Sequence, residues 1–275
     1  MSNEHDDSED VMFTIEVNGE ELTVDELGDR IRAGMYAPEE LPLTLPGRSI
    51  ALAWLAVSLA PSNDSERPAL YRRINIAVHP SGVALAATDS YWMCRAFVPF
   101  DGDHEHHEVP SLDEVPAWSF TIADVELRIR DLMRYVERIT RPKKGEDDTY
   151  RSPVAVVFTR TTDFNPDIPT LDPTLSQPQV VVEIPGEERI ISRESEIEYP
   201  NLAQLARFQP KSAEHLLFSP DLMTKAASAV ARIGGGAIRI KPNTSGSVSF
   251  HAEGTVRSLH GILMPLADDS EEAEA

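Results

Sequence analysis

The sequence predicts an α+β fold in which one unit, a short strand followed by a helix and then by further strands, occurs three times. Two observations predict it. Helical apolar spacing and strand-like alternation follow one another in the same order in each third of the chain, and turn residues separate the alternating segments. The units share the order of their elements and little sequence identity, so they form a structural repeat.

The predicted elements of the first unit are a strand over 41–45, a helix over 49–60 and strands over 72–78, 83–88 and 92–98. Those of the second are a strand over 118–122, a helix over 124–140 and strands over 153–160, 178–184 and 188–195. A polar, proline-rich insertion over 161–178 interrupts it. Those of the third are a strand over 215–218, a helix over 220–232 and strands over 236–241, 246–252 and 256–264.

The segments outside the units differ in composition from the rest. Residues 1–10 and 267–275 are acidic and poor in apolar side chains, which predicts disordered tails. A hairpin is predicted over 12–24 because the pattern alternates around Asn18-Gly19, and a short helix follows over 25–33. We therefore divide the chain into an N-terminal part, a two-unit domain, a shorter one-unit domain and a tail: 1–40, 41–198, 199–266 and 267–275.

The bulk composition limits the function classes. The chain has 275 residues and a formal net charge of −21, which argues against nucleic acid as a partner unless the basic residues cluster. A single cysteine, Cys94, excludes an internal disulfide and a cysteine-rich zinc site. There is no signal-like N-terminal segment and no run of 18 apolar residues. We therefore expect a cytoplasmic protein without a membrane span.

The basic residues do cluster on the second predicted helix. Its apolar stripe is Val125, Ile129, Leu132, Met133, Val136 and Ile139. Six basic residues fall within fifteen positions, and at 100° per residue the arginines lie nearly opposite the stripe: Arg130, Arg134, Arg138, Arg141, Lys143 and Lys144. The row is either a solvated face balanced by Glu126, Asp131 and Glu137, or a surface that contacts phosphates without reading bases.

The third predicted helix has the clearest boundaries. Ser219 is a good N-cap, Pro220 suits the first helical position, and Gly234 suits the exit. It adds only Lys225 and Arg232 to the basic residues.

No catalytic or metal site is predicted. His104, His106 and His107 resemble a metal cluster, but they lie in an acidic, loop-like stretch without further ligands at zinc spacing. Gly234 to Gly236 follow a predicted helix and so form a turn. A phosphate-binding glycine loop would instead precede a helix. We expect no enzyme, no metal and no cofactor. A metal-dependent hydrolase that uses the histidines is the alternative within the enzyme class.

An aromatic pair, Tyr91-Trp92, directly follows the turn Thr88-Asp89-Ser90. The pair either fills the core or lines a groove that a partner occupies.

The stretch "VALAATDSYWMCRAFVP" resembles the bacterial DNA polymerase III β sliding clamp family, in which a strand ends in an Ala-Thr-Asp turn. "YPNLAQL" (199–205) and "LHGILMPL" (259–266) resemble that family's domain-closing segment and C-terminal ending. The resemblance covers about residues 41–266.

The resemblance implies the DNA-clamp fold, a ring of βαβββ units whose helices face duplex DNA. It implies a non-enzymatic processivity factor whose partners are DNA, a DNA polymerase and a clamp loader. The implied DNA-binding residues are those of the second and third helices: Arg130, Arg134, Arg138, Arg141, Lys143, Lys144, Lys225 and Arg232. The implied peptide groove is formed by Thr88, Tyr91, Trp92, Pro200, Asn201, Leu263, Met264, Pro265 and Leu266.

The sequence also departs from the family. Ser90-Tyr91-Trp92 stands where the family has Gly-His-Arg after the turn. Three units per chain, or four if residues 12–40 form a degenerate one, imply a homo-oligomer of four or three copies for a ring of twelve. The alternative is a clamp-like interaction protein that forms no ring and recruits or inhibits a clamp or polymerase. Gln204 to Phe208 loosely resembles a clamp-binding peptide, which favours that alternative.

Overall fold

The computed structural model of the chain describes most of the three predicted units. The described residues are 14–17, 20–23, 26, 42–61, 66–100, 109–112, 114–123, 127–142, 154–161, 179–186, 189–193, 218–235, 237–242, 248–252 and 258–264. The strand predicted over 215–218 lies outside them except for Phe218, which is not in a strand. The histidine cluster at 104–107 also lies outside them, as does the predicted insertion over 161–178 except for Thr161, which belongs to β8.

The elements follow the predicted order. The first unit contains β3 (Pro42–Pro46), α2 (Gly47–Val57), β4 (Arg73–His79), β5 (Gly82–Thr88) and β6 (Trp92–Pro99), with a 3-10 turn, η2 (Ala69–Arg72), before β4. The second contains β7 (Trp118–Ala123), α3 (Leu127–Ile139), β8 (Ala155–Thr161), β9 (Gln179–Glu183) and β10 (Arg189–Arg193). The third contains α5 (Pro220–Arg232), β11 (Arg239–Pro242), β12 (Val248–Ala252) and β13 (Ser258–Leu263). The predicted hairpin is present as β1 (Thr14–Val17) and β2 (Glu20–Thr23).

The first two units exchange their first strands. β3 of the first unit pairs with β8 of the second, and β7 of the second pairs with β4 of the first. The result is one sheet in the order β10-β9-β8-β3 and another in the order β11-β12-β13-β6-β5-β4-β7. All pairs are antiparallel. Neither of the first two units completes its sheet without the other.

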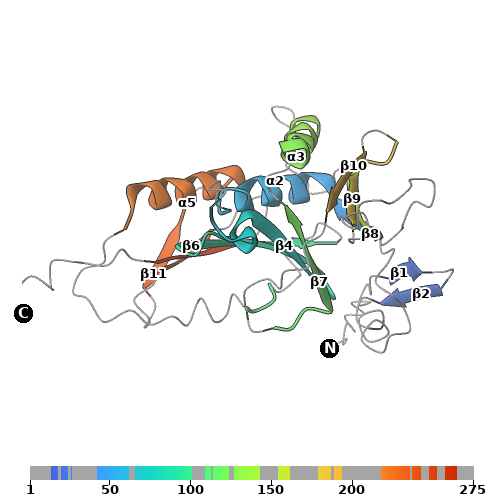
Figure 1. The fold of residues 1–275 in the computed structure, drawn as a ribbon, viewed down its shortest axis with the longest axis horizontal. Helices are drawn as coiled ribbons and strands as arrows, with labels where there is room; N and C mark the ends of the chain where they lie inside the picture. The colour runs from blue at the N-terminus through green and yellow to red at the C-terminus, as the bar shows by residue number, and fades with distance from the viewer. Residues whose placement is uncertain are drawn as a thin grey trace, which may run out of the picture.

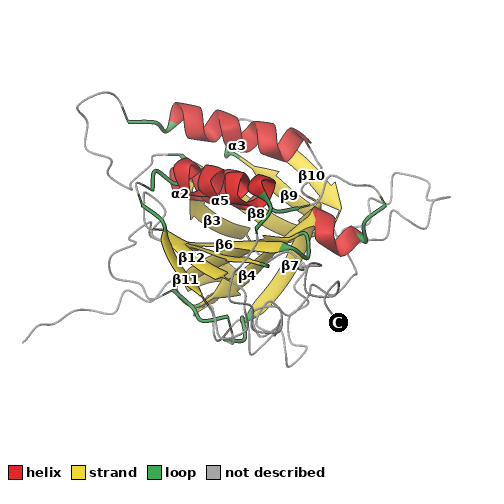
Figure 2. Ribbon diagram, turned by 90° about the vertical axis from the view of Figure 1, so that its left-hand side faces the viewer, coloured by secondary structure: helices red, strands yellow, loops and turns green. Residues whose placement is uncertain are grey.

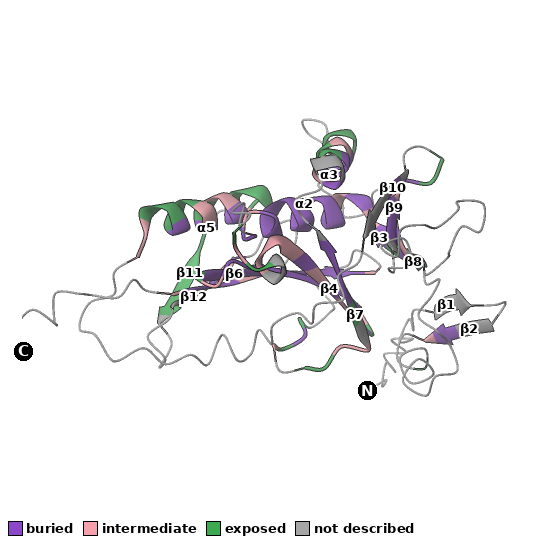
Figure 3. Ribbon diagram, viewed as in Figure 1, coloured by how far each residue is buried: buried purple, intermediate pink, exposed green. Residues whose placement is uncertain are grey.

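The helices lie together on one side of the sheets. Figures 1 and 2 show α2, α3 and α5 in a layer over the strands. α2 is buried almost all round, as expected for a helix that is apolar on every side, and the purple ribbon in Figure 3 shows this burial. Antiparallel sheets with their helices on one face are the predicted α+β class, which is confirmed.

Local sequence explains the helix boundaries. α2 begins two residues earlier than predicted, at Gly47, because the Gly47 N–H donates to the Val154 carbonyl, 2.8 Å away, and a Cβ there would collide with that carbonyl. α5 has the predicted bounds, with Pro220 in its first turn and Gly234 at φ 75° after its end. Ser219 is the N-cap but makes no side-chain capping bond; its carbonyl accepts from Met223 N.

The apolar stripe of α3 is shorter than predicted. Ile129, Leu132, Met133 and Val136 are buried, whereas Ile139 is 40% exposed. Ile139 is the last residue of the helix, so the stripe that contacts the core ends one turn earlier, at Val136. The assignment of Ile139 to the core is wrong, and Val125 lies outside the described residues.

One aromatic contact joins the third unit to the first. β13 pairs with β6 over six residues, from Ser258 opposite Phe97 to Leu263 opposite Trp92. The Phe250 ring, from β12, crosses β13 at Gly261 and stacks on Trp92 with 6.5 Å between ring centroids. A Cβ at residue 261 would collide with the Phe250 ring. Glycine is therefore required at this crossing.

We expect Gly261→Ala to destabilise the protein by about 1 to 3 kcal/mol, because the added methyl forces Phe250 off its contact with Trp92. Chemical denaturation with tryptophan fluorescence measures this. Gly186→Asn is the matched control, since Gly186 has φ 81° in open space and asparagine tolerates that conformation. Equal stability of the two variants would show that Phe250 is free to move aside.

Candidate partner-binding pocket and basic helix face

The turn between β5 and β6 is held by its own side chains. Asp89 Oδ1 accepts from the backbone N–H groups of Tyr91 and Trp92, at 2.9 and 3.0 Å. Thr88 Oγ1 donates to the Trp92 carbonyl at 2.9 Å and accepts from Ser90 N at 3.1 Å. Ser90 has a φ of 79°, the left-handed region that such bonds stabilise. The side chains of Thr88 and Asp89 thus fix the conformation of this turn.

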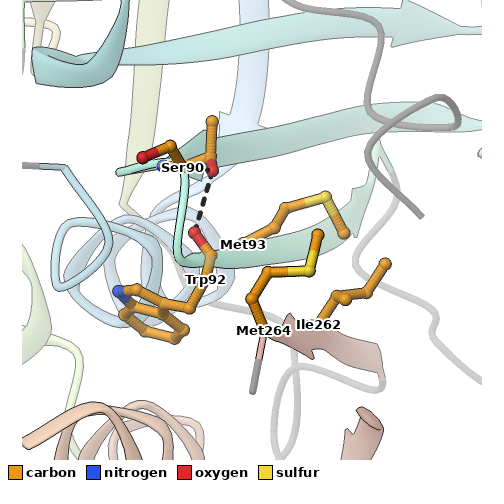
Figure 4. A pocket seen from close by; sticks show the side chains of 6 residues that line it. Ser90, Trp92, Met93, Ile262 and Met264 are labelled. Carbon is orange, nitrogen blue, oxygen red and sulfur yellow. Dashed lines mark hydrogen bonds between the residues drawn. The ribbon is translucent and has the colours of Figure 1, made fainter. Parts of the chain in front are cut away.

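A small pocket opens beside this turn, at the end of the β6–β13 ladder. It is shallow and open, and the space of about 200 Å³ between its walls includes open solvent; Thr88, Ser90, Trp92, Met93, Ile262 and Met264 line it. Figure 4 shows the side chains of Met93, Ile262 and Met264 on the same side of the strands, where they face one another. Met264 is fixed by its N–H, which donates to the Tyr91 carbonyl at 2.8 Å. The pocket is apolar apart from Thr88 and Ser90 at one side.

The two residues of the aromatic pair differ in environment: Trp92 belongs to the core, and Tyr91 is exposed. Trp92 is 1% exposed, its ring turns away from Met264 in Figure 4, and it stacks on Phe250 in the core. Tyr91 is 49% exposed, and the Arg67 guanidinium lies 5.0 Å from its ring centroid. Ser90 accepts from the same arginine at 3.3 Å. Tyr91 therefore lies at the surface beside the pocket, whereas the Trp92 ring belongs to the core on the helix side of the sheet.

The structure brings together part of the predicted groove. Thr88, Trp92 and Met264 line the pocket, whereas Leu263 is buried on the helix side of the sheet. Pro200, Asn201, Pro265 and Leu266 lie outside the described residues.

Sequence reasoning missed Ser90, Met93 and Ile262. Strand alternation was the available signal. If Met264 faces the pocket, Ile262 does too and Leu263 does not, because side chains two apart share a face.

The arginines of α3 do not share one environment. Arg134, Arg138 and Arg141 are exposed; Arg134 pairs with Asp131 at 3.0 Å, Arg141 pairs with Glu137 at 2.7 Å, and Arg138 lies over Tyr135. Arg141 lies two residues after the end of α3. Short-range pairs with an exposed arginine contribute little to stability and leave the cation accessible. Arg130 instead donates to the Ser58 carbonyl at 3.3 Å and is half-buried against the end of α2. Its predicted place opposite the apolar stripe is therefore wrong.

The two predicted cations of α5 also differ. Arg232 is exposed in the last turn, where a cation suits the helix dipole. Lys225 Nζ lies 3.8 Å from Asp89 Oδ2, so α5 contacts the turn that forms the pocket. α3 and α5 lie on the same side of the sheets (Figure 1), while the pocket side chains Met93 and Ile262 alternate with core residues and face the other side. Lys143 and Lys144 lie outside the described residues.

The sheet face away from the helices carries buried basic groups. Arg95 is 6% exposed, donates to the Pro110 carbonyl, and has its pKa lowered to about 10 by burial. Burial, followed by the nearby Arg95 charge, lowers the pKa of His79 despite its 3.1 Å contact with Glu114. Burial and the charges of Arg95 and His251 lower the pKa of His260. Both histidines are therefore held neutral near neutral pH.

Within the described ranges, no group of three or more His, Cys, Asp or Glu side chains is arranged to hold a metal ion. The predicted histidine cluster lies outside these ranges. Burial raises the pKa of the Cys94 thiol, which removes it as a nucleophile. No helix that the structure describes is long and apolar enough to cross a membrane.

No family model and no curated protein matches the chain. Solved structures do. The DNA polymerase III β subunit of Borrelia burgdorferi is 11% identical, with a TM-score of 0.48 over 87% of this chain and 68% of that one. The sliding clamp of Pseudomonas aeruginosa is 11% identical, with a TM-score of 0.49 over 82% and 66%. The Thermotoga maritima β subunit is 10% identical, with a TM-score of 0.46 over 84% and 66%.

The chain resembles bacterial DNA polymerase III β sliding clamps. This is the family whose motifs the sequence resembles. The chain spans about two thirds of the length of these three β clamps.

The lowered histidine pKa values predict acid sensitivity. Unfolded histidine titrates near 6.5, and folded His79 and His260 titrate below it, so the unfolded chain binds more protons between those values. The free energy of unfolding should therefore fall as the pH drops through 6.5. Urea unfolding at a series of pH values measures this. The double variant His79→Gln, His260→Gln should show a flatter dependence, and an unchanged slope would assign the effect to other groups.

Proposed function

We propose that this protein is a non-enzymatic sliding clamp, a processivity factor that encircles duplex DNA and tethers a DNA polymerase. The observation that carries the proposal is the separation of two surfaces across one set of sheets. Exposed arginines of α3 and Arg232 of α5 lie on the helix side, and the apolar pocket opens on the other side. A protein built this way holds DNA and a protein partner at the same time.

The DNA surface is sequence-independent. Arg134 and Arg138 project from α3, Arg141 follows two residues after its end, and the exposed charges of all three suit phosphate oxygens. Arg232, Lys143 and Lys144 extend the surface in the proposal. Arg130 serves mainly to hold α3 on α2, since its guanidinium bonds to the Ser58 carbonyl.

The ring is a homo-oligomer of three or four copies. In the first two units, β4 and β8 each pair with the first strand of the other unit. β11 occupies the same place in the third unit, and it is the last strand of its sheet in the part of the chain that the structure describes. Ile240 on this strand is 54% exposed, and Figure 3 draws β11 in green. An unpaired apolar edge suits a strand from a neighbouring copy.

The pocket takes a short peptide from the polymerase, and the clamp loader uses the same site. Thr88, Met93, Ile262 and Met264 suit one aliphatic anchor, and exposed Tyr91 extends the surface for a second. Pro200, Asn201, Pro265 and Leu266 complete the groove in the proposal.

Encirclement has a topological test. A closed ring should remain on circular duplex DNA and slide off when the circle is cut, which gel filtration of loaded complexes measures. In the double variant Arg134→Ala, Arg138→Ala, binding should weaken equally on all sequences. The slope of log affinity against log salt should flatten by about 1 for each arginine that contacts phosphate.

Arg67→Ala is the control, since Arg67 lies beside the pocket and away from α3. Equal retention on circular and linear DNA by a monomeric protein would favour the alternative, an interaction protein that forms no ring.

The pocket has a separate test. Met264→Asp should weaken binding of a labelled polymerase C-terminal peptide by about 1 to 3 kcal/mol, because the charge meets the anchor's apolar side chain. The melting temperature should change little, since Met264 is half-buried at the end of β13. Trp92→Ala is the contrasting variant and should lower the melting temperature, because Trp92 is core. Undiminished peptide binding by folded Met264→Asp would remove the pocket from the proposal.

A further inference from the structure

The seven-stranded sheet has an unusual charge distribution for this chain. Its strands β4 to β7 and β11 to β13, within the bounds given above, contain no Asp or Glu, although the whole chain has 46. They do contain seven basic or titratable nitrogen side chains: Arg73, His79, Arg95, Arg239, Lys241, His251 and His260. A solvated sheet face in so acidic a protein would carry both signs of charge.

All seven side chains lie on the same face. On each strand they alternate with residues of the core, such as Ile74, Ile76 and Val78 on β4 and Leu259 and Leu263 on β13. Directly paired residues share a face, so the strand register extends this relation to β11. The basic residues therefore all face away from the helices, on the side where the pocket opens.

The strand register places Lys241 and Arg239 of β11, which we call the basic strip, beside the pocket. Lys241 pairs with Ser249, Ser249 with Ile262, and Ile262 with Met93, the last two being pocket residues. Strands are about 4.8 Å apart, so Lys241 lies roughly 10 Å from Ile262, about three residues of extended peptide. The next row along the strands is Arg239, His251, His260 and Arg95.

The chain itself shows what binds to this face. Residues 109–112 and 114–117, between β6 and β7, contact the strands that form it. Arg95 donates to the Pro110 carbonyl, His79 contacts the Glu114 carboxylate at 3.1 Å, and Ala117 N donates to the Val78 carbonyl. The basic side chains of the face thus receive one backbone carbonyl, from Pro110, and one carboxylate, from Glu114, which are groups that an acidic peptide offers.

We propose that the partner peptide of the pocket is acidic, with an aliphatic anchor in the pocket and carboxylates about three residues away, over Lys241 and Arg239. This inference rests on the peptide-binding role proposed above and adds the chemistry of the partner. The basic strip steers and orients the peptide, while the pocket supplies the apolar contact. The apolar character of the pocket and the peptide-like contacts of residues 109–112 and 114–117 favour a peptide over a nucleic acid.

The test uses the full chain and three fluorescein-labelled peptides that differ in one segment. Each carries two leucines followed, three residues later, by three glutamates, three glutamines or three lysines, and anisotropy at 50 and 300 mM salt measures affinity. We expect the glutamate peptide to bind about tenfold tighter than the glutamine peptide at low salt and the lysine peptide to bind weakest, with the differences reduced at high salt. Moving the glutamates next to the leucines should remove the preference.

Three variants localise the effect, of which Lys241→Gln and Ala227→Glu change the net charge by the same amount. Lys241→Gln should lose most of the preference for the glutamate peptide, and Lys241→Arg should keep it. Ala227→Glu, on the exposed side of α5 across the sheet, should keep it too. Light-scattering mass and melting temperature confirm that each variant is assembled and folded as the parent is.

The outcomes separate this inference from the peptide-binding role itself. If none of the peptides binds, the peptide-binding role fails. If all three bind equally, only the acidic partner is overturned. If the preference appears only after residues 267–275 are deleted, the chain's own acidic tail is the occupant, and the inference is overturned. It is likewise overturned if a short oligonucleotide binds through Lys241 more tightly than the glutamate peptide.

Discussion

The pairing of β13 with β6 is the interaction on which the rest of this structure depends. It joins the third unit to the first in one sheet and sets α5 beside α2. The same ladder places Ile262 opposite Met93 and ends where Met264 N donates to the Tyr91 carbonyl, which creates the pocket. Phe250 can reach Trp92 across this ladder only because residue 261 is glycine. Fold and candidate site thus share one set of contacts.

The exchange of β3 and β7 completes the sheets of the first two units and leaves β11 of the third unit without an exchanged strand beside it among the described residues. Each of the first two units supplies the strand that flanks the other's sheet. A third unit has no such counterpart among the described residues, and the edge at β11 carries the exposed side chain of Ile240. When units exchange strands in pairs, an odd number of units leaves one strand edge with unpaired backbone groups. Such an edge is a physical reason for assembly between chains.

Basic residues gather on two described surfaces of a chain whose net charge is −21. The helix side presents the arginines of α3, and the opposite side of the seven-stranded sheet carries basic residues and no carboxylate on its strands. Lys225, which contacts Asp89 across the unit boundary, connects the helix side to the turn at the pocket.

The sequence by itself determined the order of elements, the bounds of α5, the Asn-Gly hairpin and the tight Thr-Asp turn, because spacing, caps and turn chemistry are local. Only the tertiary structure decided which strands exchange, that Trp92 is core while Tyr91 is exposed, that Arg130 bonds to Ser58, and that Ile262 replaces Leu263 at the pocket. Those outcomes depend on pairing between residues far apart in the chain. Local patterns specify which faces are apolar but not which distant element covers them.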